Sequence, residues 1–198
     1  MAAPATTDKR RLILEAGVRV FARQGFHTCR VADIADEAQV AYGLVYHYFS
    51  SKEEILDTLF TERWGLMLDA IGEIERESVS PREKLGAIAN FIIDSYRYDP
   101  DLMKVIIVEV TRAANTFGQT HLEDIRKAYR EVAAIVESAQ KEGVFRSEID
   151  PAFAALAFYG LIEQVLTSWI FESEPVDEAE FERAKMLIVE TISRGLER

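Results

Sequence analysis

The chain has 198 residues, of which 48% are hydrophobic and 29% are charged, a composition typical of a globular protein rather than a disordered or fibrous one. Its single cysteine, Cys29, excludes an internal disulfide framework, and three scattered histidines offer no closed zinc site. We expect no membrane span, because no apolar run approaches about 18 residues, and the polar segment 1–7 lacks the apolar stretch of a secretory signal. These features predict a soluble, metal-free, cytoplasmic protein.

The net charge of −11 is unevenly distributed along the chain. Residues 1–50 hold six basic and five acidic side chains, so almost the whole negative charge lies in the remaining 148 residues. A nearly neutral N-terminal part with a basic leading edge can approach a polyanion that the acidic remainder repels. The distribution therefore permits DNA contact at one end of the protein only.

Helical periodicity dominates the sequence, and no stretch shows the alternation of a strand or a hairpin turn. Prolines that follow Ser80, Asp99, Asp150 and Glu174 indicate helix starts behind an oxygen-bearing cap. We predict an all-α protein of about nine helices, at residues 8–24, 31–38, 42–48, 52–77, 81–98, 101–116, 120–142, 151–172 and 176–194. The first three helices are close together, which predicts a head over residues 1–52 and a larger body over residues 53–198.

Two short helices joined by a tight turn form the most informative pattern of the head. Ile34, Ala35, Ala38 and Val40 give the first of them a short apolar face, and the second opens at Tyr42. With the longer first helix as a brace, this arrangement is a helix-turn-helix unit, which places its second helix in the DNA major groove.

The head resembles the TetR-type transcriptional repressors. The motifs that carry the resemblance extend from residue 25 to residue 55, with matching spacing: Gly25-Phe26, residues 31–35, residues 38–40, Gly43, residues 46–49 and residues 52–55. The resemblance implies binding to palindromic double-stranded operator DNA. The DNA contacts that we expect come from Arg30, Tyr42, Gly43, Leu44, Tyr46, His47 and Lys52.

The chemistry of these side chains fits that role. The Tyr46 hydroxyl can bond a phosphate while its ring packs, and Gly43 lets the backbone approach DNA closely. Lys52 resembles the lysine of the family that meets a phosphate at the domain junction. The alternative is that the aromatic residues are ordinary core; we expect this for Phe49, and partly for Tyr48, because they share a face with Val45.

Two positions depart from the family pattern. The family has a small hydroxyl residue at the start of the second helix, where this chain reads Thr28-Cys29-Arg30. Either Thr28 caps one residue early, or Arg30 replaces a hydroxyl contact with a charged one. Gln39 stands where the family has the glycine of the turn, so it either adopts a left-handed conformation or reshapes the turn. Cys29 is expected to pack as a small apolar residue, with a redox role as the alternative.

The last two predicted helices carry long apolar faces. TetR-like repressors dimerise through a four-helix bundle made from two such helices of each subunit, so the resemblance implies a homodimer through residues 151–194, with Phe181 and Leu187 in the interface. The alternative is that these faces pack inside one monomer.

A second resemblance concerns the ligand. Residues 158–163 and 166–169 resemble the fatty-acid-degradation repressors, which release DNA on binding long-chain acyl-coenzyme A. The implied effector is a hydrophobic small molecule, first among candidates a fatty acyl-CoA, with its anionic part near Arg97, Lys104 and Arg112. The residues expected to line its site are Phe91, Tyr96, Met103, Ile107, Arg112, Phe158, Ile162 and Trp169. The alternative is a repressor of an efflux or catabolic gene that responds to an unrelated aromatic or lipophilic compound.

No motif of an enzyme accompanies these patterns. The sequence has no nucleophile elbow, no phosphate-cradling glycine loop and no zinc-binding His-Glu-x-x-His helix. Glu109 and Glu163 lie in apolar helices, where we expect them to bond a ligand or pair between helices. We predict no catalytic residue, cofactor or metal. A purely structural helical protein is the other alternative, and it leaves the aromatic-rich helix at residues 42–48 without a purpose.

Overall fold

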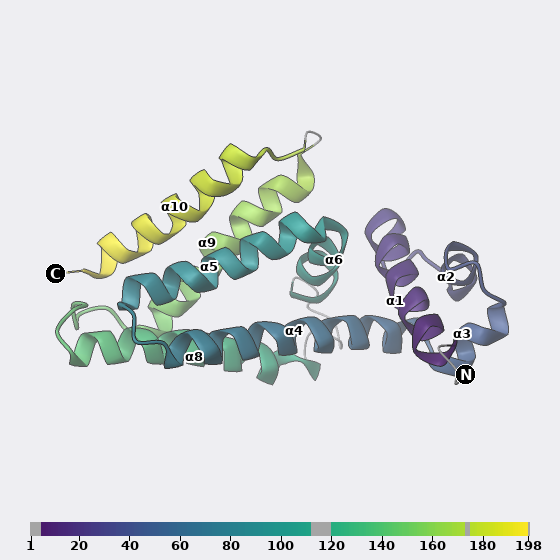
Figure 1. Cartoon of the computed structure of the whole chain (residues 1–198), viewed down its shortest axis with the longest axis horizontal. Coiled ribbons are helices and arrows are strands. Elements are labelled where there is room, and N and C mark those ends of the chain that lie inside the picture. Colours follow the sequence, from purple (N-terminus) through teal and green to yellow (C-terminus); the bar gives the residue numbers. More distant parts are fainter. Residues whose placement is uncertain (1–4, 112–119, 173–174, 198) are drawn as a thin grey trace. The chain divides into compact units, whose positions relative to one another are not determined.

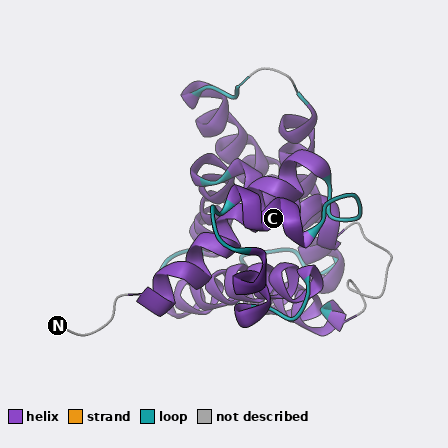
Figure 2. Ribbon diagram, turned by 90° about the vertical axis from the view of Figure 1, so that its right-hand side faces the viewer, coloured by secondary structure: helices purple, strands orange, loops and turns teal. Residues whose placement is uncertain are grey.

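The computed structural model describes residues 5–111, 120–172 and 175–197, and within them the all-α prediction is confirmed (Figures 1 and 2). The helices are α1 (Ala5–Gln24), α2 (Val31–Glu37), α3 (Tyr42–Tyr48), α4 (Lys52–Arg76), α5 (Pro81–Tyr98), α6 (Pro100–Val105), η1 (Ile106–Thr111), α8 (Leu122–Lys141), α9 (Pro151–Phe171) and α10 (Glu178–Leu196). The predicted helix over residues 101–116 is the one that differs most, because α6 continues from Ile106 as the π-helix η1.

The chain forms two compact units. The first comprises residues 1–64 and 101–113, and the second comprises residues 65–100 and 114–198. The helix-turn-helix elements α2 and α3 therefore belong to a unit that also includes α1, the first half of α4, α6 and η1. The predicted head over residues 1–52 lies within the first unit, which also takes in residues 53–64 and 101–113 that the prediction placed in the body.

The first unit is built around α1. Its buried face carries Ile13, Ala16, Val20 and Phe21, the spacing of a helix with one apolar stripe. A side-chain Cβ at Gly17 would lie 2.8 Å from Cγ2 of Ile55 on α4, so only glycine allows the two helices to approach this closely. The close packing of α1 against α4 thus fixes the position of the helix that supports the helix-turn-helix.

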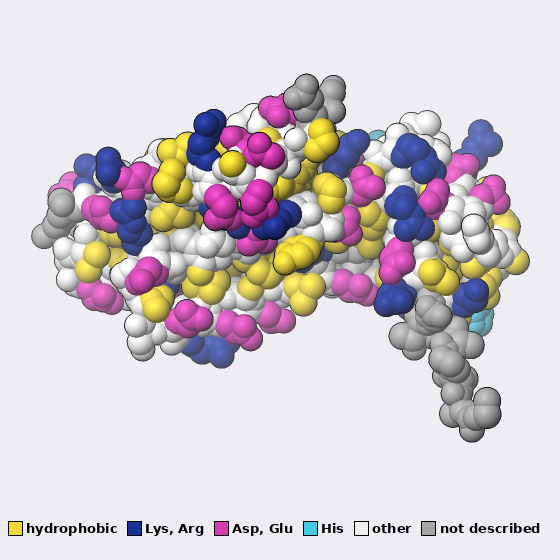
Figure 3. Space-filling view, turned by 45° about the horizontal axis from the view of Figure 1, so that its top comes forward, with side chains coloured by type: hydrophobic (Ala, Val, Ile, Leu, Met, Phe, Trp, Pro, Cys, Tyr) yellow, Lys and Arg dark blue, Asp and Glu magenta, His cyan; other side chains and the backbone are white. Residues whose placement is uncertain are grey.

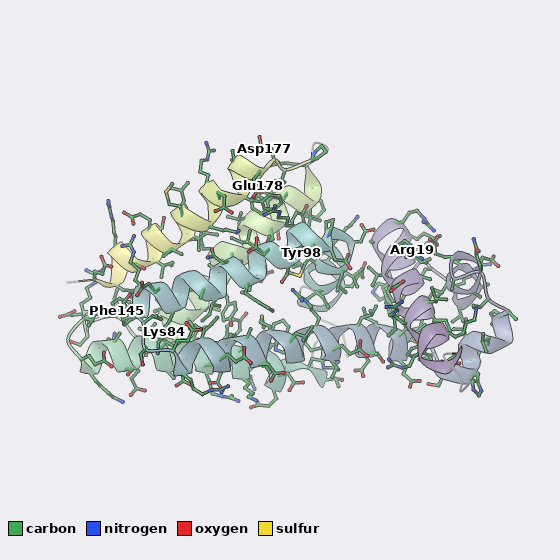
Figure 4. The ribbon with its side chains drawn as sticks, in the orientation of Figure 1. Arg19, Lys84, Tyr98, Phe145, Asp177 and Glu178 are labelled. Carbon is green, nitrogen blue, oxygen red and sulfur yellow. The ribbon has the colours of Figure 1, made fainter. Side chains whose placement is uncertain are left out.

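The second unit packs α5, α8, α9 and α10 against one another. Caps define where these helices begin: Ser80 and Glu83 form a capping box at α5, and Asp150 accepts a hydrogen bond from the Phe153 N–H at α9. At α10 the cap is Asp177, so this helix begins at Glu178 rather than behind Pro175 (Figure 4). A carboxylate next to the free N–H groups outweighs the proline signal there.

One described helix bears on the expectation that the chain has no membrane span. Among the described helices, α9 is long and apolar enough to cross a membrane by length and composition, with a mean hydropathy of 1.4 over its best window. Of that window, 44% is buried, because one side of α9 packs against α8 and α10. A core helix that is apolar nearly all round passes the same test, and this packing accounts for the composition of α9.

The turn between α2 and α3 contains a strained residue. Gln39 has a φ of 54°, so it adopts the left-handed conformation, the first of the two alternatives for this position. A non-glycine residue pays about 1 kcal/mol or more for this conformation. We expect Gln39→Gly to raise the free energy of unfolding by about 0.5–1 kcal/mol, measured by thermal or denaturant melts.

The matched control is Ala38→Gly one residue earlier. Ala38 has a right-handed φ of −76°, where glycine relieves no strain. This change is expected to lower stability by about 0.5–1 kcal/mol. Equal effects of the two variants would contradict the strain at Gln39.

Candidate nucleic-acid interface

The exposed side of α3 carries two tyrosines one helical turn apart. Tyr42 is 53% exposed and Tyr46 is 46% exposed, with ring centroids 5.2 Å apart and hydroxyl oxygens at 3.1 Å. The hydrogen bond to Tyr42 raises the pKa of Tyr46 above its usual value. Protonated hydroxyls are donors, which suits contact with phosphate oxygens.

The opposite side of α3 holds the helix in the unit. Val45 and Phe49 are buried, which confirms the core face predicted for them, and Tyr48 is half-buried. The guanidinium of Arg10 lies 5.2 Å from the centroid of the Phe49 ring. Of the other predicted contact residues, His47 and Gly43 are exposed and Leu44 is half-buried. A Cβ at Gly43 would meet nothing within 4 Å, so this surface is open.

The start of α2 excludes one of the two sequence alternatives, and the charged contact from Arg30 stays a prediction. Arg30 occupies the N-cap position, so Thr28 is not the cap, and the Asp33 carboxylate accepts a hydrogen bond of 2.7 Å from the Arg30 N–H. The fold therefore does not need a hydroxyl residue here, because Asp33 satisfies the backbone instead. The Arg30 side chain is left exposed at the surface.

Two arginines of α1 hold the end of α2. Arg19 donates to one Glu37 carboxylate oxygen at 2.7 Å, and Arg23 donates to the other at 3.0 Å (Figure 4 labels Arg19). The hydrogen bond from Arg19, together with that from Arg23, holds the pKa of Glu37 below its usual value. A lowered pKa in the folded state means that this contact adds stability above the unfolded pKa of about 4.3 and loses it as the pH falls.

We therefore expect Glu37→Gln to lower the melting temperature at pH 7 and to have progressively less effect as the pH falls below about 4.3. Thermal melts of the wild type and the variant across this range measure the difference. A Glu53→Gln variant controls for the loss of one exposed carboxylate, since Glu53 lies on the surface of α4. A melting difference between wild type and Glu37→Gln that does not change with pH would contradict the ion pair.

Lys52 binds the protein backbone in this structure, and its contact with a phosphate stays a prediction. Its ammonium donates to the carbonyl oxygens of Phe26 at 2.6 Å, Cys29 at 3.0 Å and His27 at 3.4 Å, and lies 4.7 Å from the centroid of the Phe26 ring. All three N–H groups thus serve the turn after α1. The phosphate contact predicted for Lys52 needs one of these bonds to break.

Cys29 lies beside this ammonium and is buried. Its thiol donates to the Phe26 carbonyl at 3.2 Å, and burial raises its pKa although the nearby Lys52 opposes the shift. A buried thiol with a raised pKa is a poor nucleophile. This environment favours the small-core interpretation of Cys29 over a redox role.

The residues predicted to line the effector site are distributed over both units. Tyr96 and Trp169 meet in the second unit, with ring centroids 5.7 Å apart, and Phe158 and Ile162 are buried there. Phe91 is half-buried on α5 of the same unit. Met103 and Ile107 are buried in the first unit. Arg112 lies outside the described residues.

Three further predictions are changed by the contacts within each unit. Phe181 is only 6% exposed and packs against Trp169 at 5.1 Å, so it is a core residue of its own unit rather than an interface residue. Arg97 pairs with Glu178 at 2.8 Å. Lys104 lines a pocket of about 250 Å³ in the first unit, together with Glu109 and the end of α1.

The geometry defines a class of protein: a helix-turn-helix unit with exposed hydroxyl donors on its second helix, joined in sequence to a helical bundle. The profile of the "Bacterial regulatory proteins, tetR family" matches residues 13–59, and that of the "Tetracyclin repressor-like, C-terminal domain" matches residues 81–192. The second match alone covers more than half of the chain. This chain belongs to the TetR family of transcriptional repressors and is not an enzyme.

Individual relatives agree with this assignment. The fatty acid metabolism regulator protein of Bacillus subtilis (strain 168) is 29% identical over 166 residues, covering 83% of this chain and 85% of the relative. The fatty acid degradation regulator FadR from Bacillus halodurans has a similar structure, with a TM-score of 0.81, 26% identity and 96% of each chain covered. The FadR of Bacillus subtilis in complex with stearoyl-CoA has a TM-score of 0.78 and 26% identity, covering 90% of this chain and 97% of the other. The resemblance to the fatty-acid-degradation repressors is thus confirmed.

Proposed function

We propose that this repressor binds palindromic operator DNA as a homodimer and releases it when a long-chain fatty acyl-CoA binds. The observation that carries the DNA-binding part is the Tyr42–Tyr46 hydroxyl pair on the exposed side of α3. Among the described residues of this unit, the two tyrosine rings pack on each other and stay about half exposed, and a groove lined with phosphates would cover them.

The proposed contacts follow from where each side chain lies. Tyr42, Tyr46 and His47 offer donors from the exposed side of α3, Gly43 leaves room for the duplex, and Arg30 offers a charge at the start of α2. Leu44 is half-buried, so we give it van der Waals contact only. Lys52 binds the backbone of the turn after α1, so its contact with a phosphate would replace one of these bonds. Because the proposed partner is the DNA of the cell, we also propose a cytoplasmic location.

A gel-shift assay against the DNA upstream of the chain's own gene tests the proposal. The logarithm of affinity should fall linearly with the logarithm of salt concentration, with a slope of about −0.9 per contacted phosphate. Tyr46→Phe should weaken binding about tenfold or less, and equally for cognate and mutated operators, because the lost bond is to the backbone.

Tyr98→Phe is the matched control, since Tyr98 is 86% exposed but lies on α5 of the second unit (Figure 4). It removes the same hydroxyl away from α3 and should leave affinity unchanged. If the wild type shifts no palindromic DNA at low salt, the proposed function is wrong.

The proposed dimer uses the exposed sides of α9 and α10 within residues 151–194. Large apolar side chains lie uncovered on these two helices: Phe153, Leu156, Phe171, Met186 and Leu187. Figure 3 shows hydrophobic side chains at the surface among the charged ones. In a monomer this apolar area stays in water, and a second copy of the same face removes it.

The proposed effector is hydrophobic, with a fatty acyl-CoA as the first candidate. The stearoyl-CoA complex of a relative 26% identical to this chain supports it, as do the buried aromatic and branched residues of the second unit. Within the second unit, the residues that we propose around the acyl chain are Phe91, Tyr96, Phe158, Ile162 and Trp169. Since Phe158 and Ile162 are each only 1% exposed, contact with a ligand requires the helices packed around α9 to move locally. An unrelated aromatic or lipophilic compound is the alternative.

A further inference from the structure

The turn that follows α1, residues 25–29, is held by charged side chains from outside the helix-turn-helix. Lys52 of α4 binds three carbonyl oxygens of this turn. Glu109 of η1 accepts a hydrogen bond of 3.3 Å from the Phe26 N–H. Phe26 is therefore held at its carbonyl by a cation and at its N–H by an anion, by residues 26 and 83 positions away in sequence.

The Glu109 carboxylate lies against the backbone of the turn where α1 ends. Gly25 has a φ of 80° and ends α1 in the left-handed conformation, with its N–H bonded to the Phe21 carbonyl at 2.9 Å. The next N–H, that of Phe26, points toward the Glu109 carboxylate. Only 3.7 Å separates Oε1 of Glu109 from the position that a Cβ at residue 25 would take. The carboxylate thus lies directly against the reversal of the chain.

Packing leaves one side of this turn unsupported. The pocket of about 250 Å³ lies where the end of α1 meets α6 and η1, and Gly25 and Glu109 both line it. His27 and Thr28 are exposed, and the apolar contacts of the turn come from the Phe26 ring, 5.4 Å from that of Phe21, and from the small buried side chain of Cys29. With a hollow beside it, the turn depends on its polar contacts more than a close-packed segment does.

We propose that Glu109 is a positioning residue for operator binding, which fixes the turn that sets where α2 begins and so where α3 presents its tyrosines. This inference rests on the DNA-binding part of the proposed function. Glu109 lies within the match to the C-terminal domain, at residues 81–192, and not within the match to the N-terminal domain, at residues 13–59. The DNA-binding unit of this chain is therefore incomplete without a residue from the effector-binding part of the sequence.

Glu109→Ala and Glu109→Gln test the proposal in the full-length protein, with a duplex that the wild type selects from a random-sequence library. Glu109→Ala leaves the Phe26 N–H without its acceptor, and we expect about tenfold weaker binding. Glu109→Gln keeps an oxygen acceptor at the same place, and we expect affinity within about threefold of the wild type. Glu53→Ala removes an exposed carboxylate of the same unit and is expected to change nothing.

Two further readouts separate positioning from other roles. Because Glu109 contacts no phosphate in the proposal, the salt dependence of Glu109→Ala should keep the slope of the wild type. Amide hydrogen exchange at Phe26 should be faster in Glu109→Ala and near normal in Glu109→Gln, with the exchange of α9 unchanged as the sign of an intact fold.

The outcomes are distinct. If the wild type selects no duplex, the proposed function fails. If the wild type binds, and Glu109→Ala binds equally well or keeps slow exchange at Phe26, the positioning role fails while the proposed function stands. Equal losses in the Ala and Gln variants would also overturn the inference, because the acceptor would then not be what matters.

Discussion

Replacement of Leu187 by glutamate is expected to convert the protein from a dimer to a monomer and to abolish operator binding. Leu187 is 49% exposed on α10, next to Met186 at 61%, so the new side chain is tolerated in the isolated subunit. In the proposed two-fold interface, each copy would bury an unpaired charge, which costs about 3–5 kcal/mol, and symmetry doubles that cost. Sedimentation velocity gives the oligomeric state, and the gel shift gives DNA binding.

Val144→Glu is the matched control, because Val144 is 44% exposed but lies in the turn after α8, outside residues 151–194. It should remain dimeric and bind DNA. Phe181→Glu, by contrast, should lower the melting temperature of the subunit itself, since Phe181 packs against Trp169 and Tyr96. A concentration-independent monomer for the wild type would rule out the proposed dimer.

Release from the operator is expected to become more sensitive as the acyl chain of the effector lengthens. Each buried methylene contributes about 0.8 kcal/mol, so the concentration needed for release should fall about fourfold per added methylene until the site is filled. Titration of saturated acyl-CoA compounds of increasing length into the protein–operator complex measures this trend. Between two compounds six methylenes apart, the expected change exceeds about 10³-fold.

Free coenzyme A is the control for the head group, because it carries the same charges without the chain, and it should release little DNA. Effective release requires that the ligand binds the conformation that has released DNA much more tightly than the DNA-binding conformation. A preference of about 5.5 kcal/mol moves the ratio of the released to the DNA-binding conformation from 1:99 to 99:1. If no acyl-CoA of any chain length releases the DNA and an unrelated aromatic compound does, the acyl-CoA proposal is wrong and the alternative class of effector is favoured.

Most of the fold follows from local signals in the sequence. The Ser80-Pro81 and Asp150-Pro151 caps predict the observed starts of α5 and α9, and the apolar stripe of α1 predicts its buried face. The π-helix at Ile106 has no comparable signal, because α- and π-helices use the same apolar residues and differ in which carbonyl each N–H reaches.

The roles of single site residues depend on contacts between segments far apart in sequence, which the apolar periodicity of a helix does not predict. Apolar spacing shows that Phe181 has a buried side, but not whether its neighbours belong to the same subunit. The family resemblance predicts that Lys52 contacts a phosphate of DNA. In the structure, Lys52 donates to backbone carbonyl oxygens of residues that lie 23–26 positions away in sequence. Such long-range polar contacts follow only from the folded arrangement of α1 and α4.

The hydroxyl pair on α3 has a consequence for the energetics of recognition. In the hydrogen bond between Tyr42 and Tyr46 one hydroxyl donates and the other accepts, so the accepting hydroxyl keeps its own hydrogen for a phosphate. A phosphate that accepts from this second hydroxyl adds a charge-assisted hydrogen bond to the existing one, and the two bonds in series strengthen each other. The two tyrosines are therefore energetically coupled: removing one hydroxyl releases the other, so the free-energy effects of the two substitutions do not add.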